Sequence, residues 1–244
     1  MTGLPVTLTD VSYAYGLRRA LTGVTATIRP GVVTGIVGRN GSGKSTLLNL
    51  IGGRRRPLPG AVLIDGRNPW SDAVAIANTC LARHDEGFLA GESLATTFNV
   101  ASDTRPDFSY QVADRLVEAF HLDLRLRPER LSLGERSAFA ASVAIASRCG
   151  LTMLDEVHLG MDAVARRTLW AELLTDYIEH PRTLVISSHE LNEVEDLVED
   201  VLVLVDGSLA AAGTADEVRE RFSPPGRLSS LTDVLVQLTQ GVTP

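Results

Sequence analysis

Short apolar runs alternate along this chain with longer segments whose apolar residues recur at helical spacing. The runs predict strands at residues 6–8, 24–28, 32–37, 61–64, 76–81, 151–154, 183–187 and 201–205. Helical spacing predicts helices over residues 46–51, within 92–148 and over 162–178. Because strands and helices alternate, we expect an α/β fold with a mostly parallel sheet and helices on both faces.

The end of the chain is set apart by a proline-rich break. Residues 223–226 read SPPG, which is typical of a linker. Beyond it, Leu231, Val234, Leu235 and Leu238 fall on one face of a short amphipathic helix. We expect this helix to dock on the core or on a partner. No internal repeat is found, so we expect one copy of this α/β domain.

The turn after the strand at 32–37 carries phosphate-binding chemistry. Residues 38–46 read GRNGSGKST and match the P-loop pattern in the strand–loop–helix setting that this pattern requires. Lys44 is the only lysine among the 23 basic residues. A backbone cage around phosphates accommodates a compact ammonium better than a planar guanidinium, so the single lysine marks the site.

Two acids end the strand at 151–154. In a P-loop protein an acid at this strand end holds Mg²⁺, which makes Asp155 the candidate. Glu156 follows directly, and a carboxylate facing the terminal phosphate can activate water. Either acid alone would be a moderate signal, but together with the P-loop upstream they form a strong one.

A helix start and a strand end supply two further candidates. Ser132 precedes an uncharged helix, where it can cap the helix, and a helix start can also bind anions. His189 follows the apolar strand at 183–187, the next strand after the acidic pair. That position favours a functional histidine over a structural one.

Composition narrows the class of protein. The net charge of −7 and pI of about 5.3 argue against a broad nucleic-acid-binding face, so we expect no nucleic-acid partner. Cys80 and Cys149 lie in apolar stretches and predict buried free thiols and a reducing cytoplasm. The longest uncharged stretch, 137–147, is far shorter than the roughly 20 residues of a membrane span. Any channel would therefore belong to another subunit.

Taken in order, these motifs resemble those of the ATP-binding subunit of an ATP-binding-cassette (ABC) transporter, over residues 4–213. The matching segments are the P-loop (38–46), the signature (131–135), the Walker B strand (151–156), the D-loop (159–162) and the switch histidine His189. Tyr15 occupies the place where this family stacks an aromatic ring on adenine. Tyr13 competes for that role, but the following Gly16 favours Tyr15.

The resemblance implies a P-loop NTPase (RecA-like) core with a mostly parallel sheet, an N-terminal antiparallel β subdomain and an inserted α-helical signature subdomain. The cassette would cover residues 1–222, with the helical subdomain at about 85–147, and residues 223–244 would form the linker and the C-terminal helix. Two such cassettes, identical or different, would pair head to tail around two ATP molecules.

The resemblance also implies a role for each residue. The phosphates would be held by Gly38, Asn40, Gly41, Ser42, Gly43, Lys44, Ser45 and Thr46. Ser45 would bind Mg²⁺ directly and Asp155 would support it. Glu156 would polarise the attacking water, and His189 would hold the γ-phosphate. Ser132 and Gly134 would come from the opposite cassette, and Asp162 would connect the two sites.

Two positions depart from the family pattern. Where the family has glutamine at the end of the strand that enters the helical subdomain, an ungapped alignment places His84, with Arg83 and Asp85 as alternatives. The signature reads LSLGE where LSGGQ is common, so Glu135 replaces a neutral amide with a carboxylate. We expect this carboxylate to weaken or slow closure around nucleotide.

The implied partners are a transmembrane permease subunit and a second cassette, and the implied location is cytoplasmic, on the inner face of the cell membrane. Residues 161–167 and the HEL run at 189–191 are similar to bacterial exporters of the drug, antibiotic or lipid type, which favours export over import.

Three other classes compete with this one. An ABC ATPase acting on ribosomes or DNA usually has two cassettes or a coiled-coil insertion, and this chain has neither. A P-loop kinase or GTPase lacks the signature and the switch histidine. A regulatory ATP-binding module with little turnover is kept open by His84 and Glu135.

Overall fold

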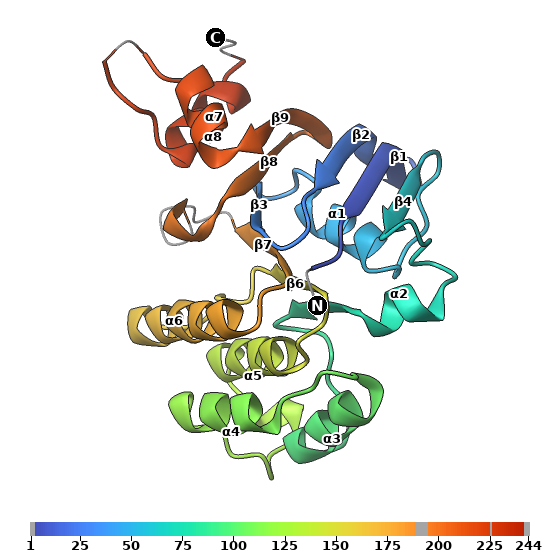
Figure 1. Ribbon diagram of the computed structural model, residues 1–244, viewed down its shortest axis with the longest axis vertical. Coiled ribbons are helices and arrows are strands. Elements are labelled where there is room, and N and C mark those ends of the chain that lie inside the picture. Colours follow the sequence, from blue (N-terminus) through green and yellow to red (C-terminus); the bar gives the residue numbers. More distant parts are fainter. Residues whose placement is uncertain (1–2, 189–194, 225, 242–244) are drawn as a thin grey trace.

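The strands form two sheets (Figure 1). The computed structural model describes residues 3–188, 195–224 and 226–241. The smaller sheet is antiparallel, with the strand order β2 (Arg18–Ile28), β1 (Val6–Tyr15), β4 (Ala61–Ile64). The larger sheet has the order β5 (Thr79–Arg83), β6 (Leu151–Asp155), β7 (Thr183–Ser188), β3 (Val33–Val37), β8 (Asp200–Val205), β9 (Ser208–Thr214). Within it only β9, which pairs with β8, is antiparallel to its neighbour.

The helices fall into groups that cover different parts of the sheets. The α-helices in the described residues are α1 (Lys44–Ile51), α2 (Ala73–Ala77), α3 (Leu94–Thr104), α4 (Tyr110–Ala119), α5 (Leu133–Ala146), α6 (Ala163–Glu179), α7 (Ala215–Arg221) and α8 (Leu231–Thr239). Short 3₁₀ turns lie at Pro128–Arg130 and Glu195–Leu197. In Figure 1, α3, α4 and α5 gather at one end of the molecule, and α7 and α8 lie at the other. The predicted α/β class with its antiparallel and helical parts is confirmed.

Two apolar cores lie on opposite faces of the large sheet. One core joins α1 to both sheets, and adjacent residues of β6 divide between the cores, with Met153 in this one and Leu154 in the other. The second core joins the large sheet to α3–α8, and the two free cysteines, Cys80 and Cys149, are buried there as expected. Alternate side chains of a strand point to opposite faces, so β6 is held on both sides and its last residue is fixed in position.

One predicted strand is wrong at its start. Residues 73–77 form the helix α2, and β5 begins only at Thr79. Asp72 caps this helix, because its carboxylate accepts hydrogen bonds from the backbone amides of Val74 and Ala75 at 2.9 and 3.0 Å. Uncharged residues continue from α2 into β5, with only Asn78 and Thr79 between the two apolar segments, so apolar character alone does not separate them.

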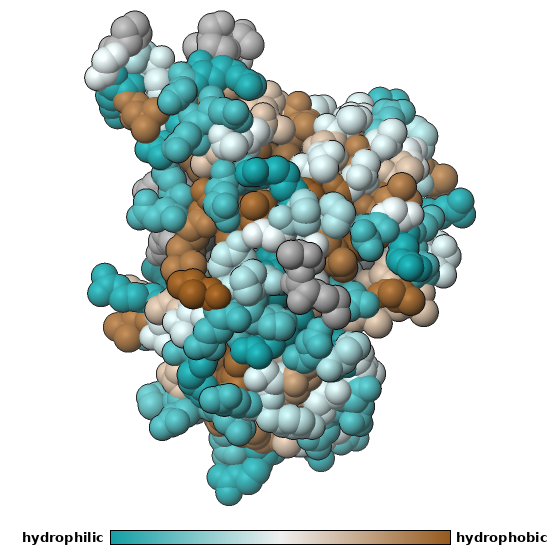
Figure 2. All heavy atoms as spheres, in the orientation of Figure 1, coloured by the Kyte–Doolittle hydropathy of each residue, from teal (hydrophilic) through white to brown (hydrophobic). Residues whose placement is uncertain are grey.

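The C-terminal helix packs on the core, as predicted. Ser230 caps α8, and Leu231, Val234 and Leu235 are buried in the core that also holds Val218 and Phe222. Helix α8 thus lies against α7. Every helix in the described part of the chain is too short or too polar to traverse a bilayer. On the face in Figure 2, hydrophilic residues predominate and apolar residues are interspersed among them.

Candidate functional site

The loop between β3 and α1 has the geometry of a phosphate cradle. Gly43 has φ +105°, and a Cβ there would lie 2.6 Å from Leu21 Cδ2, so only glycine fits. Lys44 opens α1 and is 4% exposed. Its ammonium donates to the carbonyl oxygen of Gly38 at 2.8 Å and to that of Arg39 at 3.4 Å. The lysine is therefore folded over the loop, with its charge held at the centre of the cradle.

A cavity of about 350 Å³ adjoins this loop. Its walls hold eight of the predicted residues, namely Tyr15, Asn40, Gly41, Gly43, Lys44, Ser45, Thr46 and Glu156. Ser42 lines a neighbouring cavity together with Asn40 and Gly41. The sequence interpretation missed Arg18 and Arg19, which enter the same walls from β2. The signal for them was the hairpin around Gly16, since β1 and β2 pair Tyr15 with Arg18.

Tyr15 presents its ring to this cavity. The ring is 46% exposed, and the Arg55 guanidinium lies 6.0 Å from its centroid. Tyr13, the competing candidate, contacts Tyr15 edge to face with 5.0 Å between centroids and lines a different cavity. Tyr15 is thus the aromatic ring available for stacking beside the phosphate cradle.

The two acids at the end of β6 have different surroundings. Asp155 is 2% exposed; its Oδ1 accepts a 2.5 Å hydrogen bond from the Ser187 hydroxyl, and its Oδ2 has no hydrogen-bond partner among the described residues. Glu156 has φ +50°, and its Oε1 lies 3.3 Å from the Lys44 ammonium. A buried carboxylate oxygen left without a hydrogen bond suits a hard cation, so Asp155 and the hydroxyl of Ser45 fit Mg²⁺.

The end of β5 places Arg83 beside Asp155. β5 and β6 pair Arg83 with Asp155, and Arg83 Nε lies 3.4 Å from Asp155 Oδ2. His84 comes one residue later, and its Nδ1 is buried without a hydrogen-bond partner in the described chain. At the position where the family has glutamine, the candidates were His84, Arg83 and Asp85. Arg83 is the candidate that forms an ion pair with Asp155.

The signature residues form the start of α5. The Ser132 hydroxyl caps this helix by accepting from the Glu135 amide at 3.2 Å, and the Glu135 carboxylate accepts from the Ser132 amide at 2.8 Å and from its hydroxyl at 2.7 Å. These hydrogen bonds hold the pKa of the Glu135 carboxyl below its ordinary value. The substitution that departs from the family pattern therefore completes a capping box.

Gly134 is required by packing inside the chain. A Cβ at this position would lie 2.6 Å from the carbonyl oxygen of Gly160, and the Ser137 hydroxyl donates to the carbonyl oxygen of Leu159 at 2.6 Å. Asp162 caps α6 by accepting from the Ala165 amide at 2.8 Å. The start of α5 and the turn before α6 thus form one packed unit.

The signature and the phosphate cradle do not meet in one chain. Among the described residues, the walls of the 350 Å³ cavity include neither Ser132 nor Gly134, nor His84 and Asp162. His189, the predicted switch histidine, lies outside the described residues.

The fold and the site define a nucleotide-binding protein with a P-loop at the end of β3. The family model described as "ABC transporter" matches residues 21–158. The ABC transporter ATP-binding protein YtrB of Bacillus subtilis is 26% identical over 89% of this chain and 74% of its own length. The aliphatic sulfonates import ATP-binding protein SsuB of Corynebacterium glutamicum is 28% identical over 98% of this chain and 95% of its own length. A solved ATP-binding subunit of an ABC transporter superposes with a TM-score of 0.82 at 25% identity, covering 96% of this chain and 99% of its own.

The chain therefore belongs to the ABC transporter family. It is an ATP-binding domain of that family and an ATPase. Domains of this kind work with transmembrane subunits and dimerise.

Proposed function

We propose that this chain hydrolyses ATP as one of two cassettes paired head to tail, and that the pair drives a separate transmembrane permease. The observation that carries this proposal is the division of the site. The cavity holds Lys44, Tyr15 and Glu156, while Ser132 and Gly134 stand on a separate packed unit. A signature supplied by a second cassette completes the site, so hydrolysis depends on closure of the pair.

Each residue then has a defined part. The backbone amides of residues 38–46 and the Lys44 ammonium hold the phosphates, with Tyr15 stacked on the base. Mg²⁺ neutralises phosphate charge when it is bound, and Ser45 and Asp155 are the side chains that hold it. Glu156 accepts the proton of the attacking water. His189 holds the terminal phosphate, His84 adjoins it, and Asp162 links the two sites.

The chain is divided in this proposal into a cassette at 1–222, with its helical part at about 85–147, and a tail at 223–244. The cassette works in the cytoplasm, on the inner face of the cell membrane. Export, favoured by the sequence, stays a prediction, because relatives such as SsuB are named as importers.

The Glu135 carboxylate sets the strength of pairing. In Glu135→Gln the amide oxygen still accepts from the Ser132 amide, so the helix cap persists while one negative charge facing the phosphates is lost. We expect ATP-dependent pairing to tighten by up to about fivefold, the scale of an exposed charge interaction. Light scattering across an ATP titration, in a Glu156→Gln background, measures this effect.

Glu129→Gln is the matched control. Glu129 is an exposed carboxylate in the turn before α5, and it is not the carboxylate that is hydrogen-bonded to Ser132. Pairing that is no stronger in the Glu135→Gln protein than in the protein that keeps Glu135 would refute the electrostatic role of this carboxylate.

The permease partner is tested by affinity purification of tagged Glu156→Gln protein from solubilised membranes in the presence of ATP. We expect a stoichiometric polytopic membrane protein to copurify, and its type would indicate export or import. The Lys44→Ala protein serves as the control for nucleotide dependence. A ribosome, a DNA complex or the tagged protein alone would contradict the transport proposal.

A further inference from the structure

A positive side chain is placed against the acid proposed to hold Mg²⁺. Arg83 is the last residue of β5, and the parallel register with β6 sets it opposite Asp155. Its Nε lies 3.4 Å from Asp155 Oδ2. The Asp155 side chain is 2% exposed and that of Arg83 is 22% exposed. The arginine therefore approaches a buried carboxylate from the more open side.

The contact is an ion pair without a hydrogen bond. Asp155 Oδ1 accepts from the Ser187 hydroxyl, whereas Oδ2 has no hydrogen-bond partner in the described chain although Arg83 is near. Burying a carboxylate is costly unless a positive charge compensates it, and Arg83 supplies that charge through space. Because no hydrogen bond to Oδ2 has to be broken, a cation held at this carboxylate can displace the guanidinium.

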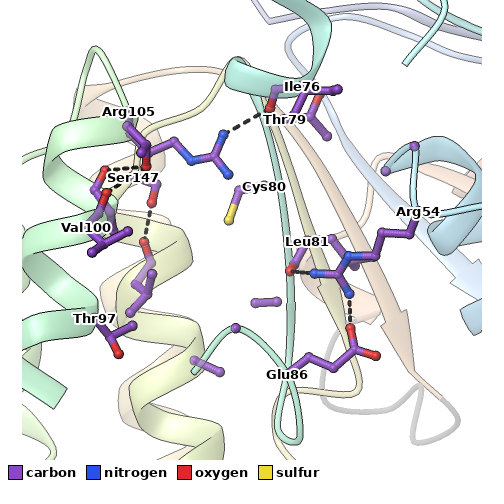
Figure 3. Close-up of a pocket in the computed structure, with 18 of the residues that line it drawn as sticks. Arg54, Ile76, Thr79, Cys80, Leu81, Glu86, Thr97, Val100, Arg105 and Ser147 are labelled. Atoms are coloured by element: carbon purple, nitrogen blue, oxygen red, sulfur yellow. Dashed lines mark hydrogen bonds and ion pairs between the residues drawn. The ribbon is translucent and has the colours of Figure 1, made fainter. Parts of the chain in front are cut away.

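Arg83 also pairs with two other carboxylates. Its Nε lies 3.4 Å from Asp85 Oδ1, and its Nη1 lies 3.3 Å from Glu86 Oε1. Glu86 also pairs with Arg54, which donates to the carbonyl oxygen of Leu81 at 3.0 Å (Figure 3). This second ion pair anchors the segment after β5 to the strand itself. An arginine that leaves Asp155 can thus stay paired with Asp85 and Glu86.

We propose that Arg83 is the counter-ion of Asp155 in the nucleotide-free protein and that Mg²⁺ arriving with nucleotide displaces it toward Asp85 and Glu86. This inference rests on the proposed function, in which Asp155 supports the metal. Arg83 is then a positioning residue that sets the Mg²⁺ concentration needed for nucleotide binding. Variants at Arg83 and at Asp85 shift that concentration in opposite directions.

The test is the Mg²⁺ dependence of binding of a fluorescent, non-hydrolysable ATP analogue, mant-AMPPNP. In Arg83→Met the competing charge is gone, and we expect the half-saturating Mg²⁺ concentration to fall about fivefold or more, the lower end of typical coupling between two sites. In Arg83→Lys the charge remains, and we expect a value near that of the unmodified protein. In Asp85→Asn the alternative partner is weakened, and we expect the value to rise.

Arg125→Gln is the matched control, because Arg125 is exposed and pairs with Asp123 on its own loop. An Arg83→Met protein with unchanged or increased Mg²⁺ requirement would overturn the inference. If Arg83→Met does not fold, the absence of a rise in Asp85→Asn would overturn it as well. Failure of the unmodified protein to bind mant-AMPPNP at any Mg²⁺ concentration would instead reject the proposed nucleotide site, and the inference with it.

Discussion

The Lys44→Ala protein is expected to lose ATP binding and ATP hydrolysis together. Lys44 is 4% exposed, and its ammonium is fixed by the carbonyl oxygens of Gly38 and Arg39 and by the Glu156 carboxylate at 3.3 Å. Removing it deletes the ammonium that is folded over the phosphate loop and breaks the ion pair with Glu156. Losing one partner of a buried charge pair has effects of about 30-fold or more, and equilibrium binding of mant-ATP measures the loss.

Lys44→Arg separates charge from shape. The guanidinium keeps the charge, but it is planar and larger than an ammonium, so we expect it to restore little binding. Thermal unfolding of each variant shows whether the fold persists. Retention of normal ATP affinity by a folded Lys44→Ala protein would remove this residue from the phosphate site.

The Glu156→Gln protein is expected to bind ATP, to stop hydrolysing it and to accumulate as an ATP-bound pair. Glutamine has nearly the same shape as glutamate, but its amide cannot accept a proton from water. A general base contributes about 100-fold to 10,000-fold to a rate. Release of phosphate measures turnover, and size-exclusion chromatography with ATP measures pairing.

Glu179→Gln is a suitable control for this variant, since Glu179 is an exposed residue at the end of α6. Normal turnover in Glu156→Gln would exclude Glu156 as the base. The loss of binding together with turnover would show that Glu156 maintains the cradle through its ion pair with Lys44.

The residue order was enough to predict the α/β fold, because β3, β6 and β7 are apolar runs with recognisable ends. Gly38 follows β3, Asp155 ends β6, and His189 follows β7. It also located the loop around Lys44, since P-loop spacing is read along the chain. It failed where a helix and a strand follow each other within one uncharged segment, as at α2 and β5. Propensity and patterning do not mark that boundary, which lies at Asn78, where the side-chain amide donates to the carbonyl oxygen of Val74 at 2.9 Å and closes α2.

Contacts between strands could not be derived from the residue order. The pairing of Arg83 with Asp155 depends on the register of β5 and β6, and the entry of Arg18 into the cavity depends on the β1–β2 hairpin. The role of Glu135 in a capping box, by contrast, follows from the S-x-x-E spacing between Ser132 and Glu135.

The contact between Gly134 and Gly160 has a mechanical consequence. Gly134 lies against the backbone of Gly160, the Leu133 side chain packs on Gly160, and Ser137 donates to the carbonyl oxygen of Leu159, so the tip of α5 and the turn before α6 are held together. We therefore expect α6 to move together with the signature. A spectroscopic probe on the solvent side of α6 is expected to report this motion.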